Sequence, residues 1–313
     1  MAAFTKLDEA DLDRFLAAGG FKKYDELRVI EGGSVNSNFR IRVDGAPYFL
    51  RLYEEQDMEG AGRELATVEK LARRGVPTPT ALGAIRQLAG RPAALFPWVE
   101  GRIRCQRSVS VDDAHCIGRS LAHLHVAGQS IEATEGRFHP AALRTRLERC
   151  SDVDFPVRRL RSTLDALEAR RNTPLPHGLV HGDLFRDNVL WDGATVLALL
   201  DFESASAGAF IYDLAVTMLA WCFGDDFAPA LVGSLVRGYE SVRVLDGAER
   251  EGVHVEACLA AVRFTITRIT DYAMRPALPD DRRVMKDWRR FLARLDALEA
   301  MGAVGLRGLT GLS

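Results

Sequence analysis

The residues best suited to chemistry lie in the segment H-G-D-L-F-R-D-N, which runs from His181 to Asn188. Within it, Asp183 precedes Asn188 by five positions, and a further acid, Asp201, follows a hairpin signal downstream. Phosphoryl transfer needs a group that accepts the proton of the attacking hydroxyl, and oxygen ligands for a divalent cation on the nucleotide phosphates. Two carboxylates and an amide in this order supply those parts. Turn preferences of Asp and Asn alone do not explain their joint spacing.

Hydrophobic periodicity divides the chain into two parts that would position this segment. The first part opens with a short amphipathic helix that Thr5 and Asp8 would cap. It continues with five β-type runs and one helical run, over residues 27–31, 38–43, 47–53, 59–74 (the helix), 81–86 and 92–99. Glu100-Gly101 ends this part, so we predict an N-terminal lobe over residues 1–100 with a five-stranded antiparallel sheet and a crossing helix.

The second part, residues 101–313, has a mainly helical pattern. Ser110 with Asp113 caps one helix, and further helices are predicted over residues 141–171, 208–222, 226–243 and 254–273. One strand pair interrupts them, over residues 189–191 and 196–200 around the turn Asp192-Gly193. The sequence therefore predicts an α+β protein with a larger, mainly helical C-terminal lobe that carries the polar segment.

The composition excludes several classes of protein. Of 313 residues, 47% are hydrophobic, and 41 basic side chains against 43 acidic ones leave no positive excess for nucleic acid or an anionic membrane. The first residues lack the pattern of a signal peptide, and the longest apolar run falls well short of the roughly 20 residues that cross a bilayer. Five cysteines without a C-x-x-C pair indicate reduced thiols. We expect a cytoplasmic protein with a small-molecule partner, and its oligomeric state stays open.

The pattern H-x-D-x-x-x-x-N followed by L-D-F resembles the aminoglycoside phosphotransferase and choline kinase superfamily, whose fold is similar to that of protein kinases. The likeness continues in order through the glycine-containing loop 31–36, the strand 48–53, the helix with Glu64, and residues 121–125 and 212–215. Within the superfamily, segments at 33–39, 88–94, 220–223 and 263–272 are most similar to the kinase-like type of homoserine kinase. The resemblance implies a bilobal protein-kinase-like fold, ATP and Mg²⁺ as cofactors, and L-homoserine as the phosphate acceptor.

The resemblance also implies roles for individual residues. It makes Asp183 the catalytic base or hydroxyl-orienting group, and it makes Asn188 and Asp201 the Mg²⁺ ligands. The phosphates would be covered by the backbone amides of Gly32, Gly33 and Ser34. The carboxylate and ammonium of homoserine would need an arginine and an acid, for which the candidates are Glu203, Arg263, Arg268 and Asp271.

One position departs from the family pattern. Where kinases place a phosphate-binding lysine on the third strand, this chain has Arg51. An arginine keeps the charge and can pair bidentately with Glu64 while facing a phosphate, although its planar fork differs from an ammonium point charge. A solvent-facing strand residue is the alternative interpretation of Arg51.

Alternatives also remain open for function and for single residues. The acceptor of a related kinase can be an aminoglycoside, a choline-like amine or a sugar, and an acidic pocket would favour the cationic ones. Arg51 motivates a catalytically silent, nucleotide-binding pseudokinase as a further alternative. Arg268 and Asp271 would share a helix face, where an ion pair on the surface is the alternative to a zwitterion site. His181 is expected to hold its loop by packing and hydrogen bonding.

Overall fold

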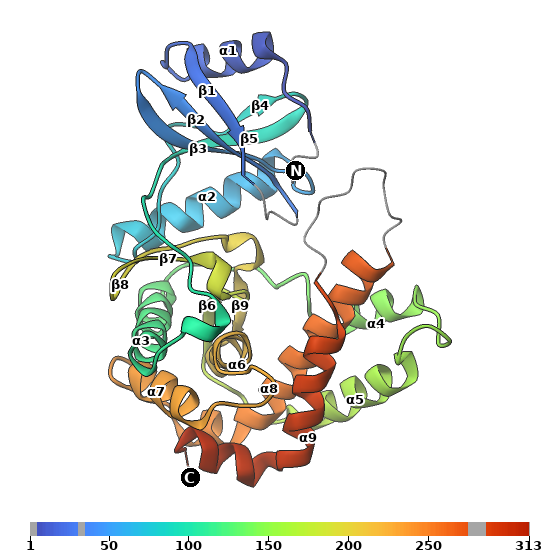
Figure 1. Ribbon diagram of the computed structural model, residues 1–313. Coiled ribbons are helices and arrows are strands. Elements are labelled where there is room, and N and C mark those ends of the chain that lie inside the picture. The colour runs from blue at the N-terminus through green and yellow to red at the C-terminus, as the bar shows by residue number, and fades with distance from the viewer. Residues whose placement is uncertain (1–4, 31–34, 275–285, 313) are drawn as a thin grey trace. The chain divides into compact units, whose positions relative to one another are not determined.

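The computed structural model describes residues 5–30, 35–274 and 286–312, and these divide into two compact units at Glu100 and Gly101. The first unit holds a five-stranded antiparallel sheet with the strand order β1-β2-β3-β5-β4. Its strands are β1 (Tyr24–Val29), β2 (Ser37–Val43), β3 (Ala46–Leu52), β4 (Arg86–Leu88) and β5 (Arg91–Pro97). Helix α1 (Glu9–Ala18) lies on one face of this sheet and helix α2 (Met58–Arg73) on the other (Figure 1). The predicted five-stranded sheet with its crossing helix is confirmed.

Alternation along the strands gives each face of the sheet its own hydrophobic core. On β3, Leu50 and Leu52 join the cluster that includes the α1 residues, whereas Phe49 and Tyr53 join the cluster on the α2 side. Successive side chains of a strand point to opposite faces, so Arg51 lies on the α2 face with Phe49 and Tyr53. The alternation of side chains along β3 therefore places Arg51 on the face of the sheet that α2 covers.

Two boundaries in this unit differ from the prediction. Helix α1 is capped by Asp8, whose side chain accepts from the backbone N–H of Ala10, and not by Thr5. The fourth strand begins only at Arg86 and turns through Ala89 and Gly90, which both have positive φ. A two-residue hairpin turn of this kind needs positive φ at both central residues, and alanine at the first of them hides the signal.

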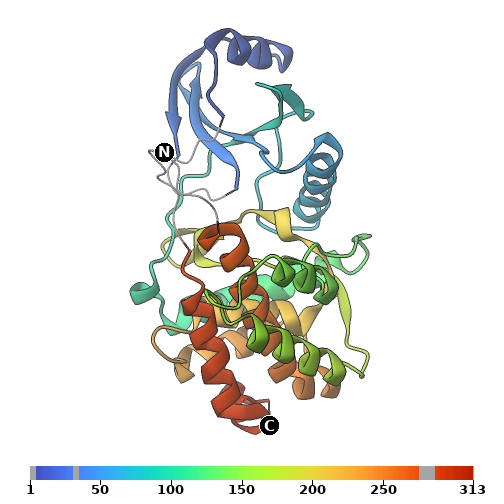
Figure 2. The same ribbon diagram turned by 90° about the vertical axis from the view of Figure 1, so that its right-hand side faces the viewer.

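The second unit is mainly helical, as predicted. Its helices are α3 (Val111–Gly128), α4 (Pro140–Glu148), α5 (Val157–Arg170), α6 (Phe210–Trp221), α7 (Pro229–Glu240), α8 (Gly247–Arg268) and α9 (Arg289–Thr310). Helix α8 is buried along most of its length and packs against α9, α6 and α5, and the two views show α9 running beside it (Figures 1 and 2). None of the helices within the described residues is long and apolar enough to span a bilayer.

Two strand pairs and several helix boundaries complete this unit. The hairpin of β7 (Val189–Asp192) and β8 (Thr195–Leu199) is confirmed, and so is the capping box of Ser110 and Asp113 on α3. A second pair, β6 (His177–Val180) with β9 (Ser206–Ala209), was not predicted, because its partners lie 26 or more residues apart. The helical range 141–171 is broken before Pro156 into α4 and α5, and α9 was also missed.

Candidate active site

The segment from His181 to Asn188 forms the loop between β6 and β7 in the second unit. It turns at Gly182, which has a φ of 73°, and a Cβ atom at this position would lie 2.9 Å from the carbonyl oxygen of Ser204. Positive φ and this close approach both require glycine, so the residue before Asp183 fixes the direction in which the chain leaves β6. The loop ends in a 3₁₀ turn over Arg186–Asn188.

Hydrogen bonds connect this loop to the segment that carries Asp201. The side-chain amide of Asn188 donates to the carbonyl oxygen of Asp183 over 2.8 Å, and its backbone carbonyl accepts from the N–H of Leu200 over 2.9 Å. Asp201 follows directly in a left-handed conformation with a φ of 64°, which is uncommon for a residue other than glycine. The fold therefore brings Asp183, Asn188 and the start of the Asp201 segment together at one end of the β7–β8 hairpin.

His181 holds the loop, as the sequence analysis expects. Its ring Nε2 lies 3.0 Å from the carbonyl oxygen of Leu200, and its Nδ1 accepts from the backbone N–H of Asp183 over 3.3 Å. These two contacts require the tautomer that carries its proton on Nε2. Burial lowers the pKa of His181, so the ring stays neutral and orients the loop without carrying charge.

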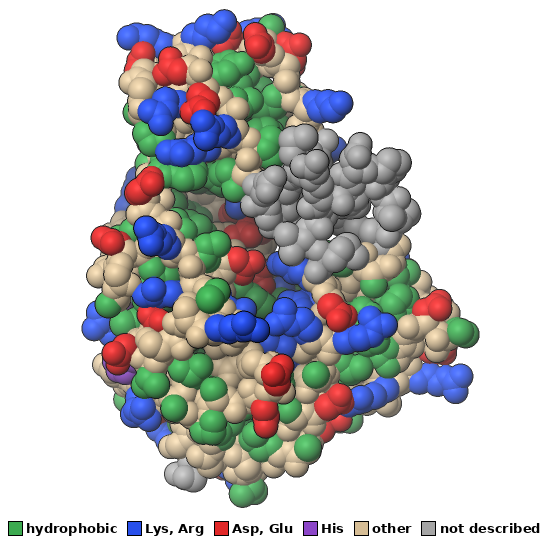
Figure 3. Space-filling model, in the orientation of Figure 1, with side chains coloured by type: hydrophobic (Ala, Val, Ile, Leu, Met, Phe, Trp, Pro, Cys, Tyr) green, Lys and Arg blue, Asp and Glu red, His purple; other side chains and the backbone are tan. Residues whose placement is uncertain are grey.

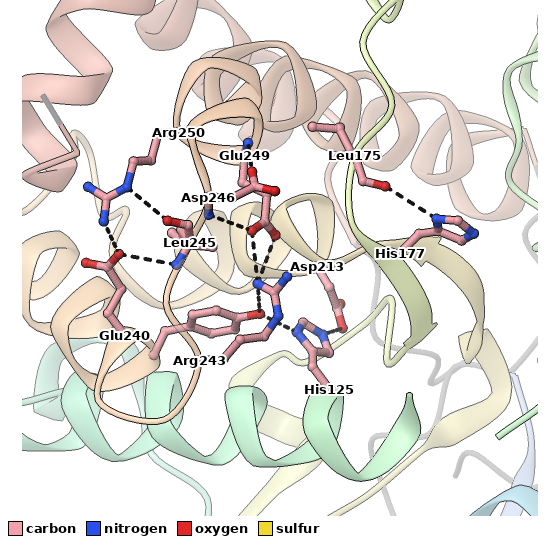
Figure 4. Close-up of polar contacts among 11 residues, drawn as sticks. His125, Leu175, His177, Asp213, Glu240, Arg243, Leu245, Asp246, Glu249 and Arg250 are labelled. Atoms are coloured by element: carbon pink, nitrogen blue, oxygen red, sulfur yellow. Dashed lines mark hydrogen bonds and ion pairs between the residues drawn. The ribbon is translucent and has the colours of Figure 1, made fainter. Parts of the chain in front are cut away.

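Asp213, in the first turn of α6, holds the loop by hydrogen bonds to its backbone. Its carboxylate accepts from the backbone N–H groups of His181 over 2.7 Å and of Gly182 over 2.8 Å. The buried ring of His125 on α3 adds a third contact of 3.0 Å, and Figure 4 shows how it lies against Asp213. Although burial opposes ionisation, these hydrogen bonds hold the pKa of Asp213 below its usual value. His125 is thus a hydrogen-bonded residue of the core.

The surroundings of Asp183 are rich in cations. Burial raises the pKa of Asp183 to about 6, while the charges of Lys286 and Arg263 oppose this rise. Lys286 itself lies 4.0 Å from the carboxylate of Asp187. The sequence analysis missed Lys286, because it lies 98 positions beyond Asn188 at the end of the loop. Only its rarity, as one of five lysines, could have drawn attention to it.

Two of the candidate acceptor residues are buried arginines on α8. Arg263 donates to the carbonyl oxygen of Gly182 over 2.5 Å, so it contacts the loop backbone directly before Asp183. Arg268 lies over the ring of Phe291 and donates to the carbonyl oxygen of Asp287 over 3.0 Å. Burial lowers the pKa of Arg268 to about 10, and the field of Asp183 is among those that act on it. Both arginines therefore lie in the electrostatic surroundings of the loop.

The two candidate acids are each paired with an arginine that the sequence analysis did not consider. Asp271 forms an ion pair with Arg146 of α4 and also accepts from Thr270, and Glu203 pairs with Arg137 over 2.8 Å. The expected sharing of a face by Arg268 and Asp271 is wrong, because α8 ends at Arg268 and the chain continues in a π-helical turn. A π turn rotates Asp271 away from the i, i+3 position of an α-helix.

In the first unit, Arg51 contacts the predicted partner. Its guanidinium lies 3.7 Å from the carboxylate of Glu64 on α2, and both side chains are largely buried. Its Nε also donates to the side-chain oxygen of Asn38 over 3.3 Å. The alternative of a solvent-facing Arg51 is wrong. The predicted phosphate-covering residues Gly32, Gly33 and Ser34 lie outside the described residues.

The residues of the second unit fit the binding of a hard divalent cation whose remaining ligands come from a nucleotide. Among the described residues, no group of three or more His, Cys, Asp and Glu side chains could hold a metal by themselves. The side-chain nitrogen of Asn188 donates to the carbonyl oxygen of Asp183, and this hydrogen bond fixes the orientation of the side chain. The side-chain oxygen of Asn188 then remains available as a metal ligand. An amide oxygen and the carboxylate of Asp201 match the preference of Mg²⁺ for a few protein oxygens beside phosphate oxygens.

The fold and the site are those of a phosphotransferase. A family profile described as the phosphotransferase enzyme family matches residues 26–252, and the chain belongs to this family. Its sequence is 36% identical to a homoserine kinase of Methylobacterium radiotolerans, covering 94% of this chain and 95% of that protein. It is 35% identical to a homoserine kinase of Brucella ovis, covering 88% and 89%.

Solved structures show the same bilobal, protein-kinase-like α+β fold. An amicoumacin kinase, in complex with AMP-PNP, Ca²⁺ and its ligand, matches with a TM-score of 0.69 at 15% identity, over 94% of this chain and 96% of that one. A microcompartment-associated aminopropanol kinase matches with a TM-score of 0.65 at 19% identity, over 98% and 100%. The chain is therefore a small-molecule kinase that phosphorylates a hydroxyl acceptor.

Proposed function

We propose that this kinase transfers the γ-phosphate of ATP, with Mg²⁺, to the hydroxyl of L-homoserine. The proposal is supported by the names of the relatives, which are similar over most of their length, and by the charges around Asp183. In the same proposal, residues 1–100 bind the nucleotide and residues 101–313 supply the catalytic loop and the acceptor site. Five free cysteines support a reducing, cytoplasmic location.

The observation that supports the choice of acceptor is the presence of three cations around the loop acids Asp183, Asp187 and Asp201. Lys286, Arg263 and Arg268 all interact electrostatically with Asp183. The face of the second unit turned to the viewer in Figure 3 shows Lys and Arg side chains gathered together. These cations would attract the carboxylate of an amino acid, a group that choline and an aminoglycoside lack.

Individual roles follow from the hydrogen bonds and charges of the described residues. Asp183 orients the acceptor hydroxyl and receives its proton, because its carboxylate is held on a loop that His181, Asn188 and Asp213 fix. Mg²⁺, held by Asn188 and Asp201 when bound, would offset charge on the ATP phosphates. Lys286 and Arg268 attract the acceptor carboxylate.

The first unit supplies the nucleotide part of the proposal. Arg51 takes the place of the phosphate-binding lysine, and Glu64 holds it, as the ion pair between strand and helix does in kinases. The loop with Gly32, Gly33 and Ser34 covers the phosphates through its amides. An Arg51→Met variant that raises the ATP KM without changing the homoserine KM would support this role, and an unchanged ATP KM would contradict it.

The test of the proposal is ADP release from Mg-ATP with L-homoserine, run beside choline, kanamycin and L-serine. An Asp183→Ala variant serves as the blank. We expect release that depends on homoserine and is lost in the variant. Release with another acceptor would retain the kinase and replace the substrate. Mg²⁺-dependent nucleotide binding without turnover on any acceptor would instead favour the silent pseudokinase.

A further inference from the structure

A cavity of about 230 Å³ lies within the second unit, and Gly182 of the catalytic loop is part of its lining. Its walls come from the segment before α4, the strand β9, the start of α6 and the middle of α8. The polar residues that line it are Arg171, Arg263, Tyr212, Ser204, Ser206, His139 and one exposed carboxylate, Glu135. Asp183, Asn188, Asp201 and Lys286 are not among its lining residues, whereas Gly182 and Arg263, one of the acceptor candidates, are. The cavity therefore adjoins the catalytic loop without including the proposed proton acceptor or metal ligands.

Arg263 has no carboxylate of the described residues in direct contact to balance its charge, and the charge of Asp183 acts on it from beyond ion-pair distance. Arg263 is only 3% exposed, and its contacts are the carbonyl of Gly182, the hydroxyl of Ser204 at 3.5 Å and two aromatic rings. No carboxylate of the described residues lies within ion-pair distance of it, and its Nε is buried without a hydrogen-bond partner. Buried charges in proteins are normally paired, because removing them from water is costly.

The other arginine of the cavity shows what the usual arrangement is. Arg171 contacts the buried carboxylate of Glu256 through two nitrogens, at 2.7 Å and 3.3 Å, and so has its counter-charge within the protein. Arg263 has carbonyl and hydroxyl oxygens instead, which satisfy hydrogen bonds but carry no full negative charge. Arg263 therefore lacks a counter-charge in direct contact such as Arg171 has, although Asp183 acts on it from further away and the exposed Glu135 also lines the cavity.

We propose that this cavity binds a small oxyanion, a carboxylate or a phosphate, which supplies the counter-charge of Arg263. Its volume is several times the roughly 30 Å³ that one water molecule occupies, so a small organic acid fits. The guanidinium, the Tyr212 hydroxyl and the serine hydroxyls supply the donors that an oxyanion needs. The phenyl rings of Phe138 and Phe264 hold the guanidinium plane in place, at 4.2 Å and 3.9 Å from its central carbon.

The same arginine gives the bound anion an influence on catalysis. Arg263 donates to the carbonyl of Gly182, and Gly182 directly precedes Asp183. An anion that binds the guanidinium changes the hydrogen bond between Arg263 and the carbonyl oxygen of Gly182. It therefore changes the position of the loop. The site thus has the geometry of an effector site for a small anionic metabolite. This part of the inference rests on the proposed kinase function, whereas the binding itself does not.

The test measures binding without measuring activity. Sodium acetate and sodium phosphate are titrated into the protein by calorimetry and by thermal melting, at an ionic strength held constant with sodium chloride. Ala207→Phe is the blocking variant, because Ala207 lines the cavity, is exposed and carries no charge. We expect one saturable site for at least one anion in the wild type, a rise in melting temperature, and the loss of both in the variant.

A second variant covers the case that Ala207→Phe does not fold. Tyr212→Phe keeps the volume and removes one donor, so it should weaken the anion affinity several-fold. The absence of saturable binding, or binding that neither substitution changes, would overturn the site. Binding that saturating homoserine competes away would assign the anion to the acceptor site and overturn the proposal as well.

A rate measurement tests the effector role separately. Acetate or phosphate at the measured binding concentration should change kcat in the wild type and leave it unchanged in Ala207→Phe. An unchanged rate with intact binding would overturn the effector role. Failure of the proposed function would show as no turnover at all, with the binding result unaffected, so the two failures are distinguishable.

Discussion

The carboxylate of Asp213 lies 2.7 Å from the backbone nitrogen of His181, although the two residues are 32 positions apart in the chain. This contact joins the first turn of α6 to the loop that carries Asp183. A buried, ionised acid that accepts backbone N–H groups fixes their position more firmly than a neutral partner would, because charge-assisted hydrogen bonds are stronger. The rigidity of the loop therefore depends on a residue that does not reach the reacting atoms.

We expect Asp213→Asn to destabilise the protein and to slow it. The amide would place an N–H₂ group against backbone donors and would leave them without the acceptor charge. The loss of stability should be about 3 kcal/mol, as for a broken buried charged pair. Urea unfolding and kcat at a temperature where the variant is folded measure both effects. Thr217→Val on the same helix is the control, because Thr217 contacts only the backbone oxygen of Asp213.

Asp183→Asn should lower kcat by about 10²–10⁴, because the loop keeps its hydrogen bonds while the proton acceptor is lost. Nucleotide affinity should change little. Steady-state kinetics and nucleotide titration separate the two. The exposed turn residue Asp192 provides the matched control, and an Asp192→Asn variant with an equal loss would show that the effect is not specific to the loop acid.

Asp201→Asn should raise the Mg²⁺ concentration needed for half-maximal rate by about tenfold or more, since an amide is a weaker ligand than a carboxylate. Kinetic titration with Mg²⁺ at saturating ATP measures the change. A variant with the wild-type Mg²⁺ dependence would remove Asp201 from the metal site.

Lys286→Met should raise the acceptor KM much more than the ATP KM, because it removes a cation beside Asp183 and leaves the first unit untouched. Full kinetics with each substrate varied in turn give the two values. Lys70→Met, on the exposed face of α2, is the control and should behave like the wild type. Equal increases in both KM values would speak against a role for Lys286 at the acceptor.

Stability should fall as the pH is lowered through about 6.5. Burial lowers the pKa of His125, so the folded protein binds a proton there less readily than the unfolded chain. The stabilisation is thus complete above the unfolded pKa of about 6.5 and decreases by up to about 1.4 kcal/mol per pH unit below it. Unfolding in urea at several pH values should show a smaller decrease in His125→Gln. His123→Gln, exposed on the same helix, should keep the wild-type slope.

Local sequence determined the parts of this protein whose signals are short-range. The spacing of Asp183, Asn188 and Asp201 indicated phosphoryl transfer, and alternation in the strands and helical periodicity gave both units and the β7–β8 hairpin. Glycine at position 182 and the Ser110 capping box act within a few residues, so their patterns are visible in the chain itself.

Only the tertiary structure decided which distant residues surround the loop. Lys286 and the pairings of Asp271 with Arg146 and of Glu203 with Arg137 join segments whose separation no periodicity encodes. Helix α8 ends at Arg268, so Asp271 does not lie on the expected helix face. Packing also places Arg263, a candidate for the acceptor site, in contact with the loop backbone. The packing of the helices against one another determines which charged groups come into contact. Electrostatic attraction depends on distance in space and not on separation along the chain, so the sequence alone does not reveal these pairs.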